Sequence, residues 1–386
     1  MYSQINFTAG SNFYLNLYCF ILYCFLLLIS LRGNVGAINR DHSKIRTIML
    51  FCGITWFALT SFINDDFFHY YEIMGDYKRG VMDSEFIGLE MPYQYIIYYF
   101  GGNYFLFRLI VWGGSLLLIA LSARAFGVSA YNTMFLVLAG FIIIFSYARA
   151  TLAMSIFALG AVTISLASEQ RRAMLKKLIG IGIMALSIYF HRSMLPMVII
   201  AVPLLLLPYK RDFTRLSLYL FPIMVLGCSL LLREAFGELT LLANSTMDDE
   251  SGILKKMEYY AEDKGVESNL NGYIALTLKY ATFYVPLLLI AISLRSKKVI
   301  KTLDNRCIWL YLITYLMIVI ATSMLFIGFD SDVLFYRYLF MSFVPLCILI
   351  SYMRQNDILS VKSYNFIIIC FIISNLLQLF TLVYAS

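Results

Sequence analysis

The sequence predicts an all-α polytopic membrane protein of about 12 transmembrane helices, with residues 1–386 forming a single integral membrane domain. Composition is the first reason. The chain is 61% hydrophobic and 14% charged, whereas soluble domains average about a quarter charged residues. Periodicity is the second: apolar runs recur along the whole length, each approaching the roughly 20 residues that cross a bilayer core.

Polar breaks between the apolar runs define the individual spans. Residues 178–208 are too few for two ordinary spans, but a single crossing there would invert the charge bias of every later loop. We therefore predict a tight hairpin that turns at His191-Arg192-Ser193. No basic residue precedes the first apolar run, so that run is expected to remain in the protein. The predicted spans are 13–31, 46–63, 104–122, 131–148, 150–167, 177–191, 194–208, 216–232, 273–294, 307–327, 337–353 and 364–384.

The connections between these spans separate the charges. Every second connection lies on the same side of the membrane, and the connections of one side together carry 19 of the 30 basic residues and only five of the 23 acidic residues. The positive-inside rule makes that side cytoplasmic and places both termini outside. The net charge of +7 is then a topology signal and does not indicate a nucleic-acid partner. Two extracytoplasmic loops, 64–103 and 233–272, are long enough to shape a cleft, and 254–264 has the pattern of an amphipathic surface helix.

Four arginines lie inside or at the edge of apolar runs: Arg108, Arg149, Arg192 and Arg337. His191 adjoins one of them. A cation within the membrane is costly and usually faces the bundle interior, where it marks a site. The predicted topology puts all five residues near the outer surface, as expected of a pocket for an anionic, lipid-linked substrate. The plainer alternative is that an arginine at a span end extends to the interface.

Five short elements resemble, in their order, those of the bacterial polysaccharide polymerases, the family of O-antigen polymerases and EpsG-like exopolysaccharide polymerases. The chain departs from the family at Asn64-Asp65, where glycine-threonine is frequent, and at Ala150, where glutamine is common. These departures affect the subfamily more than the class. The elements are Asp66-Phe67-Phe68-His69-Tyr70, Glu90-Met91-Pro92-Tyr93, Arg149-Ala150-Thr151-Leu152-Ala153, Phe190-His191-Arg192-Ser193, and Arg337 leading into the span with Pro345.

The resemblance implies a glycosyltransferase of the bacterial plasma membrane with the multi-span, GT-C-like architecture of lipid-dependent enzymes. Such a polymerase transfers a growing glycan from undecaprenyl pyrophosphate to the non-reducing end of a new lipid-linked repeat unit at the outer face. The implied partners are the undecaprenyl-pyrophosphate-linked oligosaccharide, membrane lipid and a chain-length regulator. The donor is already activated, so no cofactor is expected.

The chemistry assigns a role to each predicted site residue. Arg149 and Arg337 would bind the pyrophosphate on which negative charge develops, with Arg192 and Arg108 as helpers. Asp66 and His191 are the two candidates for the base that accepts the acceptor hydroxyl proton, although His191 could equally donate to phosphate. The remaining two residues, Glu90 and Tyr70, are expected to bind substrate. The ring of Tyr70 suits stacking on a sugar or anchoring at the membrane interface.

Other readings remain open from the sequence. Paired acids at Asp65-Asp66 and Asp330-Ser331-Asp332 could hold a divalent metal, but the arginines would do the same work on the phosphate, which favours a metal-independent enzyme. A lipid-linked oligosaccharide flippase, a sugar acyltransferase and an O-antigen ligase are the alternative functions. A transporter is expected to spread polar residues through the full membrane thickness, whereas here they gather at one face.

The seven cysteines stand singly in apolar runs, as small buried residues do.

Overall fold

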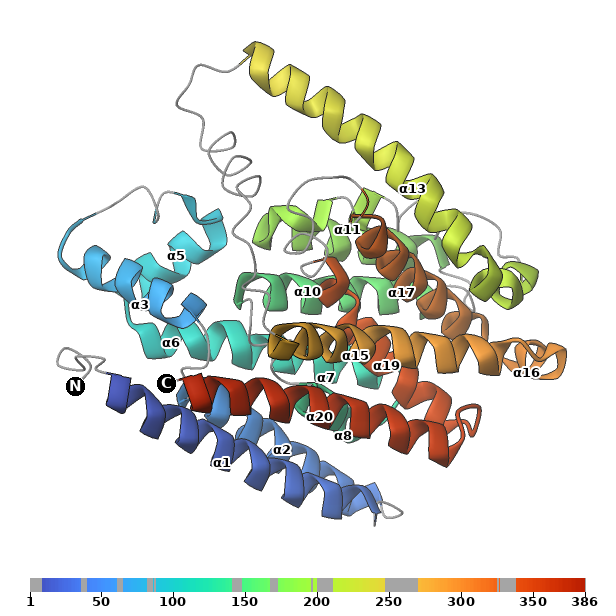
Figure 1. Ribbon diagram of the computed structural model, residues 1–386, viewed down its shortest axis with the longest axis horizontal. Helices are drawn as coiled ribbons and strands as arrows, with labels where there is room; N and C mark the ends of the chain where they lie inside the picture. Colours follow the sequence, from blue (N-terminus) through green and yellow to red (C-terminus); the bar gives the residue numbers. More distant parts are fainter. Residues whose placement is uncertain are drawn as a thin grey trace.

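The structure, a computed structural model of the chain, is a bundle of helices (Figure 1). It describes residues 9–35, 40–60, 65–81, 86, 88–140, 148–166, 173–195, 197–199, 211–246, 270–324, 326 and 338–385, and no strand occurs among them. The helices are α1 (Ala9–Val35), α2 (Arg40–Thr60), α3 (Asp65–Lys78), α5 (Met91–Tyr99), α6 (Tyr104–Arg108), α7 (Gly114–Phe126), α8 (Ala130–Ala139), α10 (Ala148–Leu166), α11 (Ala173–Phe190), α13 (Arg211–Thr246), α15 (Leu270–Leu294), α16 (Lys297–Thr302), α17 (Asn305–Met324), α19 (Phe343–Gln355) and α20 (Val361–Ala385). A π-helical turn, η1 (Leu109–Gly113), joins α6 to α7, and a 3₁₀ turn, η3 (Arg192–Met194), follows α11.

Several of these helices have the length and composition of membrane spans. Four within the described ranges are long and apolar enough to cross a bilayer: Tyr104–Phe126, Arg149–Leu166, Phe213–Leu231 and Asn305–Met324. Five shorter apolar helices accompany them. Every predicted span except 194–208 overlaps a described helix, and most of 194–208 lies outside the described residues. The prediction of an all-helical chain with membrane-spanning segments is therefore supported.

The two predicted outer loops differ from the structure in their helix content. α13 continues to Thr246, so the first third of 233–272 is helix; the segment after Leu232 is rich in helix-forming Glu, Leu and Ala and lacks proline. The first loop, 64–103, likewise contains α3 and α5. α5 covers the aromatic element that we expected to be short and interfacial. The amphipathic segment 254–264 lies outside the described residues.

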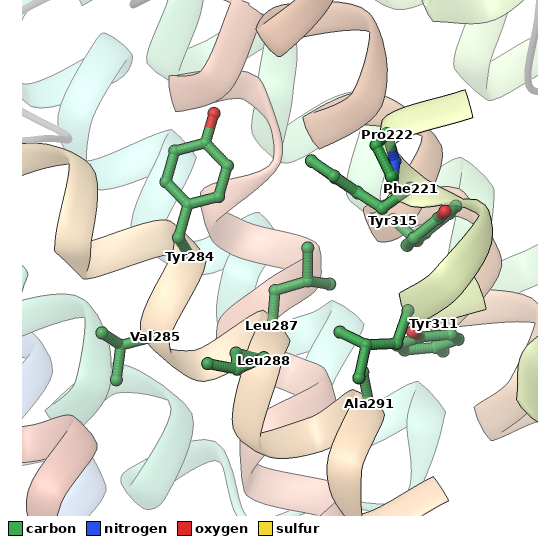
Figure 2. A pocket seen from close by; sticks show the side chains of 10 residues that line it. Phe221, Pro222, Tyr284, Val285, Leu287, Leu288, Ala291, Tyr311 and Tyr315 are labelled. Carbon is green, nitrogen blue, oxygen red and sulfur yellow. The ribbon is translucent and has the colours of Figure 1, made fainter. Parts of the chain in front are cut away.

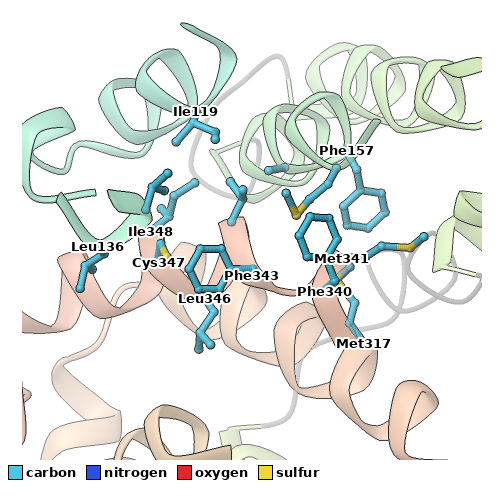
Figure 3. Close-up of a cluster of buried hydrophobic side chains, with 14 of the residues drawn as sticks. Ile119, Leu136, Phe157, Met317, Phe340, Met341, Phe343, Leu346, Cys347 and Ile348 are labelled. Atoms are coloured by element: carbon cyan, nitrogen blue, oxygen red, sulfur yellow. The ribbon is translucent and has the colours of Figure 1, made fainter. Parts of the chain in front are cut away.

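The core of the bundle is built around α19. Figure 3 shows Phe343 and Cys347 among side chains from α7, α8, α10 and α17. The Phe343 ring also lies 5.9 Å from Phe283 of α15 and 5.6 Å from Phe371 of α20. α17 and α19 are apolar on all sides, and other helices bury both of them over nearly their whole length. The other helices therefore take their positions from these two.

α10 and α11 approach each other more closely than ordinary side chains allow. Gly160 of α10 and Gly180 of α11 face each other, and a Cβ built on either residue would lie 2.8–2.9 Å from the carbonyl oxygen of the other. Small residues at such a crossing let two helix backbones touch. This contact matters for function because it fixes Arg149, in the first turn of α10, relative to His191, just after α11.

The connections that the charge pattern assigns to one side gather at one end of the bundle, which we call the basic end. Gln355, the last residue of α19, donates to Gly127 O at 3.4 Å and accepts from Ser129 N at 3.2 Å in the α7–α8 turn. Arg306 donates to Phe126 O at 3.2 Å, and Arg211 donates to Asn305 Oδ1 at 3.2 Å. α3, α5, the start of α1 and the end of α20 lie at the opposite end (Figure 1).

Candidate functional site

At the opposite end from the basic connections, Glu90 stands immediately before α5. The chain leading to it is held against α3, since the Phe86 ring stacks on Tyr77 at 5.4 Å. Pro92 favours helix initiation in the first turn of α5, and the Glu90 carbonyl accepts the Tyr93 N–H at 2.9 Å. The Glu90 carboxylate is thereby fixed at the start of a helix, where backbone N–H groups favour negative charge.

The Glu90 carboxylate joins two side chains that are far away in the sequence. Arg149 Nη1 donates to Glu90 Oε2 at 2.9 Å across 59 residues. His191 Nδ1 lies 3.1 Å from Glu90 Oε1 across 101 residues. The two oxygens of one carboxylate are thus divided between a guanidinium and an imidazole.

Arg149 is held from two further directions. Its carbonyl accepts a hydrogen bond from the Tyr93 hydroxyl at 3.1 Å, and its guanidinium lies 6.0 Å from the centre of the Tyr70 ring. No described residue bonds to its Nε or Nη2. The side chain is 30% exposed. Within the described part of the chain, Nε and Nη2 are therefore the atoms of Arg149 with which a ligand could bond.

His191 occupies the break between α11 and η3. Its backbone is extended (φ −158°), and its N–H still bonds to Ser187 O at 2.9 Å. α11 thus ends where the hairpin turn was predicted, whereas most of the predicted second arm, 194–208, lies outside the described residues. α11 ends beside Glu90, and α13 begins at the basic end.

Burial and nearby positive charge shift the pKa of the Glu90 carboxyl group in opposite directions. Its side chain is 10% exposed, and burial alone would raise the pKa of this carboxyl group. The hydrogen bond from His191 and the positive charges of Arg149 and His191 outweigh burial and lower the pKa to about 2. An ionised carboxylate only accepts hydrogen bonds, so Nδ1 of His191 carries the proton in this contact. In neutral His191 the other nitrogen, Nε2, is then free to accept a proton, and no described residue bonds to it.

Sequence reasoning missed Tyr93 as a site residue. The side chain is fully buried, and its ring packs against Phe107 and Phe190 with centroids 6.2 and 6.1 Å away. It thus connects α5, α6 and α11 beneath the ion pair. The available signal was its position three residues after Glu90, within the element already singled out.

Four predicted site residues come together. Tyr70, Glu90, Arg149 and His191, with Tyr93, form what we call the Glu90 cluster. The place of Tyr70 differs from the prediction: it is 1% exposed and packs against Phe107 at 5.3 Å, so its ring supports Arg149 and presents no face to a sugar.

Two predicted arginines do not join the cluster. Arg108 is 1% exposed, donates to the Ala58 carbonyl, and lies between the rings of Tyr104 (5.4 Å) and Trp112 (5.5 Å). It connects α6 to α2 inside the protein and cannot reach a substrate there. Arg192 is exposed on η3, one residue beyond His191, and makes no contact with Glu90. Depth in the membrane was predicted for both, but depth does not decide which way a side chain points.

The remaining predicted residues lie beyond what the structure describes. Arg337 and the Asp330-Ser331-Asp332 acids are outside the described ranges, and Asp66 is described only as the second residue of α3. Among the side chains that are described, no group of three or more His, Cys, Asp or Glu could hold a metal ion.

Comparisons of the chain with protein-family models, with curated proteins and with solved structures gave no match. The argument for a function therefore depends on the geometry of the Glu90 cluster.

Proposed function

We propose that this protein is a metal-independent membrane glycosyltransferase that extends a glycan at the outer face of the bacterial plasma membrane. It would move the growing chain from undecaprenyl pyrophosphate to the non-reducing end of a new lipid-linked repeat unit, using about 12 spans in a GT-C-like arrangement. The observation that carries the proposal is the sharing of Glu90 between Arg149 and His191. It joins a guanidinium, a group that can bind an anion, and an imidazole, a group that can accept a proton, to the two oxygens of one carboxylate.

In the proposed reaction the acceptor hydroxyl oxygen attacks the anomeric carbon of the donor sugar. The hydroxyl proton passes to Nε2 of His191, and the imidazolium that forms is stabilised by Glu90. The bond from the anomeric carbon to pyrophosphate breaks, and its electron pair stays on the phosphate oxygen. The open part of the Arg149 fork would bind that oxygen, where charge develops in the transition state. No nucleotide is consumed.

The distribution of charge along the helices favours transfer at one face over passage through the membrane. In α10, α11 and α17 the charged residues of the described ranges stand only near one end: Arg149, Lys176, Lys177 and Arg306. The middle of each helix is apolar. A transporter needs polar groups along its path at all depths, so the flippase is the second candidate here. The O-antigen ligase shares the proposed chemistry and differs only in the acceptor.

The decisive experiment is elongation in vitro by the purified chain, with the lipid-pyrophosphate-linked repeat unit as the substrate. We expect a ladder of longer products that persists in EDTA and is lost in Arg149→Ala. Arg149→Lys, which keeps the charge but not the fork, should restore only a small part of it. Arg192→Ala is the matched control, because this neighbouring arginine is exposed and outside the cluster.

Other outcomes would redirect the assignment. Loss of the ladder in EDTA would transfer the chemistry to a metal held by carboxylates. Movement of the lipid-linked unit across liposomes without any ladder would identify a flippase. Polymer attached to a different lipid acceptor would identify a ligase. Equal activity of Arg149→Ala and wild type would exclude the mechanism.

A further inference from the structure

An apolar cleft lies between α13, α15 and α17 and shares no lining residue with the Glu90 cluster. Its volume is about 270 Å³, and Figure 2 shows Phe221 and Pro222 of α13 on one side and Leu287 and Leu288 of α15 on the other. Ala291, one turn after Leu287 on α15, also lines it. Its lining is almost wholly carbon, so the surface suits a hydrocarbon and offers little to a sugar or a peptide backbone.

The tyrosines of the cleft do not change this character, because their hydroxyls are already bonded within the protein. Tyr311 shares a hydrogen bond with the Ser217 hydroxyl at 2.7 Å, and Tyr315 donates to the Ser217 carbonyl at 2.7 Å. The Tyr284 hydroxyl bonds to Thr322 at 2.7 Å. Each ring therefore presents carbon to the cleft.

The cleft also faces the region where lipid would surround the bundle. Leu288 is 46% exposed, and on α13 the side chains of Ile223 and Leu226 are 64% and 60% exposed. Large apolar side chains exposed on a membrane-spanning helix are those that contact acyl chains. An occupant can enter sideways from the bilayer.

Basic residues lie around one end of the cleft, and we call Arg215, Arg295, Lys297 and Lys298 the basic collar. Arg215 lies one turn before Leu218, Arg295 lies one turn after Ala291, and Arg215 Nε donates to the Arg295 carbonyl at 3.4 Å. The Arg295 guanidinium lies over the Tyr219 ring at 5.4 Å. Lys297 and Lys298 follow, both exposed.

The four cations beside the cleft, Arg215, Arg295, Lys297 and Lys298, outnumber the acidic residues nearest to them in the sequence, Asp212 and Asp304. Asp304 accepts from Arg306 at 2.9 Å and from the Tyr352 hydroxyl at 2.8 Å, so it is engaged on the other side of α17. A basic collar beside an apolar cleft between helices is the arrangement that binds anionic lipid headgroups.

We propose that the cleft is a binding site for an anionic phospholipid. One acyl chain lies between α13 and α15, and the phosphate lies against Arg215 and Arg295. The lipid ties α13 to the α15–α16 corner at the basic end. This site is separate from the Glu90 cluster and does not depend on the proposed activity.

Thermal unfolding of the detergent-purified full chain tests the proposal. Phosphatidylglycerol should raise the melting temperature by several degrees, because a ligand that binds only the folded state stabilises it. Phosphatidylcholine with the same acyl chains, and inorganic phosphate alone, should leave the melting temperature unchanged. An equal shift with phosphatidylcholine, or with phosphate, would overturn the proposal.

Variants locate the site. Arg215→Gln with Arg295→Gln should remove most of the phosphatidylglycerol shift, and so should Leu288→Trp, which fills the cleft without changing charge. Arg124→Gln is the control, since Arg124 is an exposed arginine of the basic end on α7. Retention of the full shift in both test variants would place the lipid elsewhere. If the double variant does not fold, native mass spectrometry of the wild-type chain replaces it as the test. The protein should then retain phosphatidylglycerol in preference to phosphatidylcholine, and equal retention of the two lipids would refute the site.

Discussion

At the scale of the residue, Glu90 decides what its two partners can do. By accepting from Nδ1 it sets the tautomer of His191, and by pairing with Nη1 it sets the direction of the Arg149 fork. An arginine near the membrane surface without such a partner would be free to extend into water. The carboxylate therefore acts as a positioning residue for both.

Replacing Glu90 with glutamine keeps the shape of the side chain and removes its charge. We expect Glu90→Gln to lower kcat for chain elongation about 100-fold, because His191 loses both its fixed tautomer and the stabilisation of its charged form. Elongation rates over a range of donor concentrations measure this. KM should rise less than kcat falls.

Asp76→Asn is the matched control, since Asp76 pairs with Arg79 on α3 outside the cluster. It should leave the rate unchanged. A Glu90→Gln variant with wild-type kcat and only a raised KM would assign Glu90 to substrate binding alone.

The lowered pKa of Glu90 predicts how acid affects stability. In the unfolded chain this carboxyl group titrates near 4.5, whereas in the folded protein its pKa is about 2. The folded state therefore binds this proton more weakly, and stability present above pH 4.5 is lost as the pH falls towards 2. Melting temperatures of wild type and Glu90→Gln should differ most near neutral pH and converge in acid. A constant difference at every pH would contradict the assignment.

At the scale of the element, the α10–α11 pair supports the site. Arg149 and His191 come from helix ends that meet Glu90 only because the two backbones touch at Gly160 and Gly180. A Cβ on either glycine would meet the carbonyl oxygen of the other at less than 3.0 Å, so a side chain here would push the two helices apart.

Gly180→Ala should therefore destabilise the protein by about 1–3 kcal/mol, as overpacking does in a tight interior. Activity should fall with it. Gly182→Ala provides the control on the same helix, because a Cβ there meets nothing within 4 Å and alanine favours helix. Thermal unfolding of both variants in one detergent gives the comparison. Equal melting temperatures would mean that the helices do not touch at this point.

The sequence predicts most helices here because apolar runs bounded by polar residues leave few alternatives in a membrane. The end of α13 could not be predicted in this way. Beyond Leu231 the chain becomes polar, which signals the membrane surface, but polarity does not distinguish a loop from a helix that continues into water. The π-helical turn after Arg108 also carries no signal in composition.

At the scale of the whole molecule, the two ends of the bundle have different chemistry. Basic turns, held to one another by Gln355 and Arg306, form one end, and the Glu90 cluster lies near the other. The positive-inside pattern predicts that the basic end faces the cytoplasm.

Labelling of single cysteines tests this orientation. In a chain whose native cysteines have been replaced, Tyr99→Cys on α5 should react with a membrane-impermeant maleimide in intact cells. Lys298→Cys on α16 should react only after the membrane is opened. The reverse pattern would place the Glu90 cluster in the cytoplasm and exclude a reaction at the outer face.

The site could be predicted as a set of residues but not as a set of contacts. Resemblance and membrane depth singled out Glu90, Arg149 and His191. Nothing in the sequence shows that the Glu90 carboxylate contacts both Arg149, which follows it by 59 positions, and His191, which follows it by 101 positions. Depth also predicted Arg108, which the aromatic rings around it turn inwards. Side-chain direction depends on packing that the sequence does not display.

α13 is longer than a single crossing of the membrane requires. Its 36 residues extend about 54 Å, whereas the hydrocarbon core is about 30 Å thick. Even a tilt of about 40° leaves a height of roughly 41 Å. Ser323, in the last turn of α17, donates to the Val225 carbonyl, so the rest of α13 as far as Thr246 extends past the described end of α17. The far part of α13 therefore stands away from the side of the bundle (Figure 1), and a large neighbour or product on that side must pass around it.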